Sequence, residues 1–133
     1  MKNIYKDYLS KMNMNGKSFT NIKAVGKALG IRFPADYLQF MQKYNGGEGV
    51  IANSYIALWS AENIAELNEA YAVTEFAPGL ILFGSDGGDL AYAFDTRRES
   101  IRVVAVPFIG MDLKTINDCA DSFIGFLEYL NRK

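Results

Sequence analysis

The chain has 133 residues, the length of one domain, and its composition of 50% hydrophobic and 22% charged residues is typical of a protein with a packed core. It contains no histidine, which excludes Ser-His-Asp and Cys-His catalysis, histidine-ligated zinc sites and the commonest general base at neutral pH. The net charge of -1 argues against a general nucleic-acid-binding protein, so we expect no nucleic-acid partner.

The first 17 residues carry only a weak pattern. Ile4, Tyr8 and Met12 recur every four residues, which predicts a short helix ending near Gly16. Charged residues interrupt every apolar run, so there is no signal-peptide core, and no run is long enough to span a membrane. The single cysteine, Cys119, cannot form an internal disulfide. We therefore expect a cytoplasmic protein without a membrane partner, in which this thiol is buried or inert.

Two helices are expected next. Ser18 suits the N-cap of the first helix, and Gly30 suits its end in the left-handed conformation. Pro34 suits the first turn of the second helix, which ends at Asn45-Gly46-Gly47. We interpret this glycine motif as a helix stop rather than as a binding loop. The expected core-facing stripes are Ile22, Val25 and Leu29 in the first helix and Tyr37, Phe40, Met41 and Tyr44 in the second.

The middle of the chain has two short β-rich runs, residues 50–51 and 55–59, followed by a helix. Ser60 is expected to cap this helix, which extends from about residue 61 to residue 71. Glu62, Glu66 and Glu69 are spaced at i, i+4 and i+7, which places them together on one helix face. The expected apolar stripe is Ile64, Leu67 and Tyr71.

Three further strands and a helix complete the chain. Residues 80–83 are an apolar run of strand length, and residues 90–94 alternate large and small side chains, which predicts a strand buried on one side. Between them, Asp86-Gly87-Gly88-Asp89 is interpreted as a hairpin turn, since it has too few oxygen ligands at the right spacing for calcium. Residues 101–106 predict a strand closed by Pro107, and residues 118–133 predict a helix capped by Ser122 or Asp121. Its expected inward side chains are Phe123, Phe126, Leu127 and Leu130.

Strands joined by short turns pair antiparallel, so the expected fold class is α+β. We expect a small antiparallel sheet of about four to six strands, with N-terminal helices, one mid-chain helix and a C-terminal helix packed around it. No composition shift or linker divides the chain. Residues 1–133 are therefore expected to form one domain, with residues 1–17 as an N-terminal extension.

The charges are segregated along the chain. Residues 1–43 carry a net charge of +6, residues 44–99 carry −7, and residues 100–133 are neutral. Like charges at i, i+4 destabilise a helix, so the three mid-chain glutamates are a poor choice for stability alone. A solvated face and a surface for a basic partner both explain them. Trp59, Tyr55 and Tyr71 lie around this helix, and each suits core packing or, where exposed, an interface anchor.

Two motifs resemble a family signature. The first is Phe33-Pro34-Ala35-Asp36-Tyr37-Leu38-Gln39-Phe40-Met41 with Tyr44-Asn45-Gly46-Gly47, and the second is Phe83-Gly84-Ser85-Asp86-Gly87-Gly88 leading into Tyr92-Ala93-Phe94-Asp95. With the aromatic C-terminal helix they resemble the SUKH superfamily, which includes a fungal cell-wall synthesis regulator and many bacterial immunity proteins. The resemblance covers most of the chain after about residue 20. It implies an α+β domain that binds a protein partner, with no known catalytic site.

The resemblance implies an immunity-type protein, not an enzyme, that neutralises a cognate bacterial toxin domain such as a nuclease. It would occlude a basic toxin surface with an acidic face, without cofactor or metal. An alternative is a non-enzymatic regulatory or scaffold domain in cell-envelope or stress physiology. The candidate partner-binding residues are Glu48, Trp59, Glu62, Glu66, Glu69, Asp86 and Asp89. The candidate structural motif residues are Pro34, Asn45, Gly46, Gly47, Gly84, Gly87 and Gly88.

Overall fold

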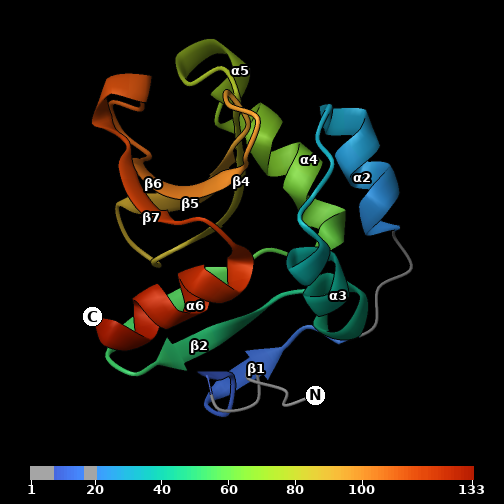
Figure 1. Cartoon of the computed structure of the whole chain (residues 1–133), viewed down its shortest axis with the longest axis vertical. Helices are drawn as coiled ribbons and strands as arrows, with labels where there is room; N and C mark the ends of the chain where they lie inside the picture. Colours follow the sequence, from blue (N-terminus) through green and yellow to red (C-terminus); the bar gives the residue numbers. More distant parts are fainter. Residues whose placement is uncertain (1–7, 17–20) are drawn as a thin grey trace.

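The fold is built on a seven-stranded antiparallel sheet in which the strands pair in sequence order. The computed structural model, shown in Figure 1, describes residues 8–16 and 21–133. Its strands are β1 (Met12–Met14), β2 (Gly47–Ile51), β3 (Ser54–Leu58), β4 (Leu80–Ser85), β5 (Leu90–Asp95), β6 (Arg102–Pro107) and β7 (Asn117–Ala120). The expected α+β class is confirmed, and the sheet has more strands than the four to six expected.

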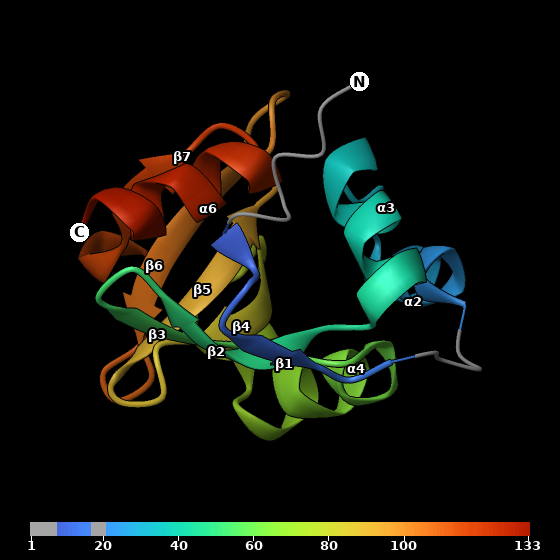
Figure 2. The same ribbon diagram turned by 90° about the horizontal axis from the view of Figure 1, so that it is seen from below.

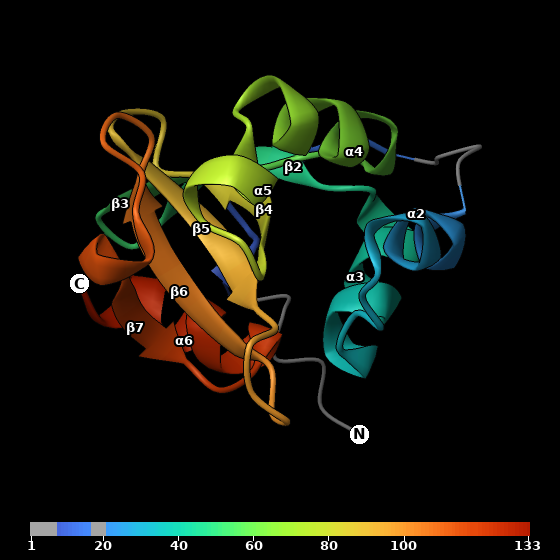
Figure 3. The same ribbon diagram turned by 90° about the horizontal axis from the view of Figure 1, so that it is seen from above.

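Helices cover both faces of this sheet. They are α2 (Ile22–Leu29), α3 (Ala35–Tyr44), α4 (Ala61–Ala70), α5 (Val73–Phe76) and α6 (Phe123–Arg132), with a 3-10 turn, η1, at Leu113–Thr115. Figure 3 shows α5 over β4 and β5, with α6 on the other side of the sheet. The sheet is therefore the middle layer between two separate apolar cores.

The larger core lies between one face of the sheet and helices α3 and α6. Tyr37 of α3 is fully buried there, and its ring meets the rings of Phe94 and Phe123 edge-on at centroid distances of 4.9 and 5.2 Å. Asp36 joins α3 to α6, because its carboxylate accepts a hydrogen bond from the backbone N–H of Ile124 at 3.0 Å. These contacts place the two helices against the same sheet face.

A smaller core covers the opposite face of the central strands. Ala91 and Ala93 of β5 are fully buried in it together with Leu82 of β4, and Val73 and Ala77 of the α5 region pack in the same cluster. The prediction that β5 is buried on one side only is therefore wrong. Its small side chains are buried as completely as its large ones, because α5 packs over the second face.

Local signals placed the ends of α2 and α3 correctly, but not the start of α2. Gly30 ends α2 with a φ of 79°, and Asn45 ends α3 with a φ of 56°, both in the left-handed region. Pro34 is the N-cap residue of α3, one position before the first turn in which it was expected. The expected N-cap Ser18 lies outside the described residues. Instead the side chain of Asn21 caps α2 by accepting a backbone N–H of its first turn at 2.9 Å.

The N-terminal segment contains a strand where the sequence predicts a helix. Met12 lies in β1, opposite Gly49 of β2, and the backbone N–H of Gly16 donates to the carbonyl of Tyr44 at 3.0 Å. The prediction is wrong at Met12, because its pairing partners lie far along the chain and outweigh a weak local pattern. Ile4, at the start of the predicted helix, lies outside the described residues.

The C-terminal helix begins later than predicted. Residues 118–120 belong to β7 and pair with β6, so the helix starts at Phe123 rather than at residue 118. Ser122, not Asp121, is its N-cap, because the Ser122 hydroxyl accepts the backbone N–H of Gly125 at 2.9 Å. The inward stripe from Phe123 to Leu130 is buried as expected.

Candidate functional site

The predicted partner-binding residues come from four parts of the structure. Their contacts divide them into a group around Trp59 and the β4–β5 turn, and a group on the outer side of α4. The positions are Glu48 on β2, Trp59 after β3, Glu62, Glu66 and Glu69 on α4, and Asp86 and Asp89 in the β4–β5 turn. The motif glycines Gly47 and Gly84 lie within β2 and β4.

Tyr55 connects the acid on β2 to the β4–β5 turn. Its hydroxyl donates a hydrogen bond to the Glu48 carboxylate, which raises the pKa of Tyr55. A Cβ at Gly87 would lie 2.7 Å from the Tyr55 ring, and the φ of Gly87 is +81°, so this position requires glycine. Asp86 closes the turn by accepting the backbone N–H of Gly88 at 2.8 Å. Glu48 and the turn therefore lie side by side.

A row of exposed and half-buried apolar side chains begins beside this turn. Trp59 stacks on Tyr71 with ring centroids 6.4 Å apart, and Tyr71 contacts Phe108 at 4.7 Å. The backbone N–H of Phe108 donates to the carbonyl of Asp89 at 2.9 Å, which joins these rings to the turn. Tyr71 is 40% exposed and Ile109 is 91% exposed. We call Trp59, Tyr71, Phe108 and Ile109 the apolar row.

Sequence periodicity missed most of the apolar row. Tyr71 was expected on the buried stripe of the mid-chain helix, and that prediction is wrong, since α4 ends at Ala70 and Tyr71 projects beyond the core. Phe108 and Ile109 directly follow Pro107, the last residue of β6. The signal for these two residues was their position, an apolar pair directly after the proline that ends a strand. The pair belongs to neither a helical nor a strand periodicity, unlike most core residues.

The α4 glutamates lie apart from the apolar row. Glu62, Glu66 and Glu69 are all exposed, and at 100° per residue they lie within about 60° of one another around the helix. Tyr71 comes nine residues after Glu62, which corresponds to roughly half a turn of rotation. The stripe and the row are therefore on opposite sides of α4. The acids beside the row are those of β2 and the β4–β5 turn.

Asn45 organises the start of α4 from the end of α3. Its Oδ1 accepts the backbone N–H of Ala61 at 2.8 Å, and its Nδ2 donates to Oε1 of Glu62 at 2.9 Å. Ser60 occupies the expected N-cap position but makes no side-chain capping bond. Gly46 follows with a φ of +83°, and a Cβ there would collide with the backbone at the end of β3. The Asn-Gly-Gly motif thus ends one helix and caps another.

Asn68 joins α4 to the sheet, and the sequence carried no signal for it. It is buried, its Nδ2 donates to the carbonyls of Ile64 at 2.8 Å and Leu82 at 2.9 Å, and its Oδ1 accepts the Leu82 N–H at 2.9 Å. The β3–β4 ladder ends with the bond from the Trp59 N–H to the Phe83 carbonyl. At Leu82 the side chain of Asn68 therefore makes the hydrogen bonds that a neighbouring strand would otherwise make. These bonds hold α4 against β4.

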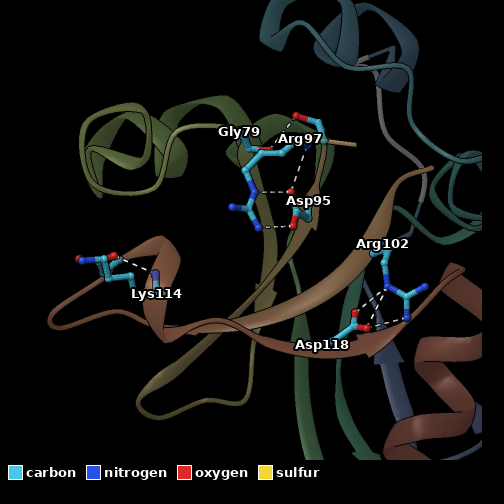
Figure 4. A network of polar contacts seen from close by, with 8 residues as sticks. Gly79, Asp95, Arg97, Arg102, Lys114 and Asp118 are labelled. Atoms are coloured by element: carbon cyan, nitrogen blue, oxygen red, sulfur yellow. Dashed lines mark hydrogen bonds and ion pairs between the residues drawn. The ribbon is translucent and has the colours of Figure 1, made fainter. Parts of the chain in front are cut away.

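An arginine-lined pocket of about 180 Å³ lies at the opposite end of β5 from the turn. Figure 4 shows its two ion pairs. Arg97 contacts Asp95 through Nε at 2.9 Å and Nη2 at 2.8 Å, and Arg102 contacts Asp118 at 2.7 Å. Each of these two arginines is neutralised by an aspartate, so the pairs act mainly to hold the β5–β6 connection and β7 on the sheet.

Asp95 gives this end of the sheet a pH-dependent stability. Hydrogen bonds from Arg97 hold the pKa of Asp95 below its ordinary value of about 3.9. Its stabilising contribution is complete above the unfolded pKa and is lost as the pH falls through the folded pKa. We expect Arg97→Gln to lower the free energy of unfolding by about 1 kcal/mol at pH 7, with the difference vanishing at strongly acidic pH. Urea denaturation across this range measures it, and a difference that persists under acid contradicts the assignment.

Three further findings concern the described residues. Within residues 8–16 and 21–133, no group of three or more His, Cys, Asp or Glu side chains is placed to hold a metal ion. Burial raises the pKa of the Cys119 thiol, which lowers its thiolate fraction at neutral pH. In the same part of the chain, no helix combines the length and the apolar character needed to cross a membrane.

Comparison with known proteins identifies the family. A model of the SMI1 / KNR4 family (SUKH-1) matches residues 18–129. The match begins before α2 and ends within α6, so it includes every strand except β1. No curated protein matches the chain. The SUKH superfamily includes toxin immunity proteins, and its members are generally non-enzymatic immunity or regulatory domains. Since the match covers most of the sequence, the chain belongs to the SMI1 / KNR4 family (SUKH-1).

Proposed function

We propose that this protein is an immunity-type protein that binds a cognate toxin domain and blocks its active surface. The observation that carries the proposal is the apolar row next to the acids of β2 and the β4–β5 turn. The half-buried Trp59 and Phe108 flank the 40% exposed Tyr71, and the 91% exposed Ile109 follows Phe108 in the chain; this much apolar surface is costly in water unless a partner covers it. Membership of a family that includes immunity proteins supports the same conclusion.

The apolar row provides the affinity of the complex. Aromatic side chains at the centre of an interface commonly contribute most of its binding energy, because they bury much area at little entropic cost. Trp59 is fixed in place because it packs against both apolar cores. Tyr71 stacks on Trp59 and remains 40% exposed to solvent. A rigid base under an exposed ring is the arrangement expected of a preorganised anchor.

The acidic residues provide specificity for a basic partner. Glu48, Asp86 and Asp89 border the row and would meet lysine or arginine side chains of a toxin, for example those that bind nucleic acid in a nuclease. The α4 stripe lies on the other side of the helix and therefore acts through its long-range field. Such a field speeds association and is screened within about 10 Å at moderate salt.

The electrostatic part is tested by charge reversal on α4. The triple variant Glu62→Lys, Glu66→Lys and Glu69→Lys is expected to slow association with the toxin by about tenfold at low salt, with little change in dissociation. The partner is the toxin encoded by the neighbouring gene, first co-purified and then measured by stopped-flow fluorescence. The matched control reverses Glu99, Asp121 and Glu128, which changes the net charge equally. Equal association rates for the two triple variants would show that the α4 glutamates do not steer association.

The apolar row is tested by its effect on dissociation. Tyr71→Ala and Ile109→Asp are each expected to raise the dissociation rate at least about tenfold, the effect of an interface hot spot. Phe76→Ala, at another exposed apolar residue, serves as the control. If the neighbouring toxin forms no complex with the wild-type chain, or binds both row variants as tightly as wild type, the proposed function is wrong.

A further inference from the structure

A basic groove lies in the N-terminal part of the chain, which carries the excess of positive charge. It takes no part in the proposed toxin-binding surface. It has a volume of about 710 Å³ and is formed where α2, the α2–α3 connection and the first turns of α3 meet. Figures 2 and 3 show α2 and α3 side by side, to one side of the sheet. The cations at this groove are Lys23, Lys27 and Arg32, and its apolar lining includes Ile31, Phe33 and Leu38.

The floor of the groove is built by the end of α2. The N–H of Gly30 bonds to the carbonyl of Lys27 at 3.2 Å and the N–H of Ile31 bonds to that of Gly26 at 2.9 Å, which is a Schellman motif. This motif turns the chain back so that Ile31 and Phe33 pack against α2. A Cβ at Gly26 would lie 2.8 Å from the Ile31 carbonyl oxygen and 2.9 Å from the Phe33 ring. The floor is therefore fixed before any ligand binds.

The charged residues of the groove are all cations. Lys23 and Lys27 are four residues apart on α2 and so lie on one helix face, and Arg32 comes from the following connection. All three are exposed, no acid lines the groove, and no ion pair within the described residues includes any of the three. A preformed apolar floor beneath uncompensated cations complements a ligand that is both acidic and apolar.

We propose that this groove binds an acidic peptide segment of a protein partner, anchored by one or two large apolar side chains. The apolar side chains would rest mainly on Ala35 and Leu38, which Ile31 and Phe33 support from the core, and carboxylates beside them would pair with Lys23, Lys27 and Arg32. Such a pairing of central apolar contacts and rim charges is common in peptide recognition. The site is independent of the apolar row, so the two proposals can fail separately.

Two other occupants fit the groove less well. A second copy could offer the glutamates of α4, but the residues between them on the outer face, such as Asn63 and Ala65, supply no large apolar side chain for the floor. Single-stranded nucleic acid would need an exposed ring for base stacking. Among the described residues that line the groove, Phe33 alone carries a ring, and it is 3% exposed. A peptide with acidic and large apolar side chains complements both the cations and the apolar floor of the groove.

The probe is a fluorescein-labelled synthetic peptide of alternating Glu and Asp with a central Phe-Leu pair, measured by fluorescence anisotropy against the full chain. The same peptide with Ser-Ser in the centre and an oligothymidylate strand are compared with it. We expect Lys23→Glu, Lys27→Glu and Arg32→Glu together to weaken binding of the probe by about tenfold or more. A control triple at Lys43, Lys114 and Lys133 changes the net charge equally and is expected to bind normally.

A second variant tests the floor without altering charge. Ala35 lines the groove and is exposed, so Ala35→Trp is expected to fill it and abolish the advantage of the Phe-Leu peptide over the Ser-Ser peptide. Thermal denaturation of each variant confirms folding. The proposal is overturned if the probe does not bind, if both charge triples weaken it equally, or if oligothymidylate binds more tightly. Self-association of the wild-type chain that the groove triple abolishes, seen by light scattering, would identify a second copy as the occupant and overturn it too.

Discussion

Asn68→Ala is expected to lower the free energy of unfolding by about 3 kcal/mol, a large effect for one polar residue. The substitution leaves the N–H and the carbonyl of Leu82 without their bonds to the Asn68 side chain, at 2.9 Å each. Each buried polar group without a partner costs about 1–3 kcal/mol. Chemical denaturation at neutral pH measures the change.

Two controls separate the hydrogen bonds from the volume of the side chain. Asn68→Leu keeps a similar volume but still removes every bond to Leu82, so it is expected to be destabilised as much as Asn68→Ala. Asn63→Ala, at an exposed position of the same helix, is expected to change stability by less than about 0.5 kcal/mol. Wild-type stability in Asn68→Leu would show that filling space, and not pairing Leu82, is the role of this residue.

Elements whose ends are encoded locally were predictable from the sequence. Gly30 and Asn45 end their helices in the left-handed conformation, which few residue types adopt without strain, so each is a signal that needs no tertiary information. The β4–β5 turn was predictable for the same reason, since Gly87 has a positive φ. Helix stops and tight turns depend on a few neighbouring residues and can be inferred from them alone.

Elements that depend on distant partners were not predictable in this way. β1 exists because its residues pair with Gly47 and Gly49 on β2, and β7 exists because Asn117–Ala120 pairs with β6. The cap of α4 likewise comes from Asn45, while Ser60, the local candidate, makes no capping bond. In each case the deciding contact joins residues that only the folded chain brings together.

The candidate site was predictable in part. The sequence indicated Trp59 and the acidic turn, because an aromatic residue and a glycine-rich turn are visible locally. It left core packing and an interface role both open for Tyr71, since a periodic pattern does not show where a helix ends relative to the core, and it carried no signal that Phe108 would contact Tyr71. The helical period already placed Tyr71 on a different face from the α4 glutamates, but it could not show that Tyr71 would be exposed and would stack on Trp59.

Asn45→Ala is expected to lower the free energy of unfolding by about 3 kcal/mol and to loosen the start of α4. The substitution removes the acceptor for the Ala61 N–H and the donor to Glu62, and it places a Cβ-bearing residue without a polar side chain at a φ of 56°. A buried N–H without a partner costs about 1–3 kcal/mol, and the left-handed conformation costs a further 1–2 kcal/mol. Denaturation curves and amide hydrogen exchange at the first turn of α4 measure both effects.

The two causes at Asn45 can be separated by a second substitution. Asn45→Gly removes the side-chain bonds but suits the left-handed conformation, so it is expected to lose about 2 kcal/mol and still to show faster exchange at Ala61. Asn53→Ala, at an exposed position of the β2–β3 turn, is the control. Full stability in Asn45→Gly would mean that Asn45 serves only to end α3. Reduced stability with rapid exchange at Ala61 would establish that it also holds α4 and the first acid of its stripe in place.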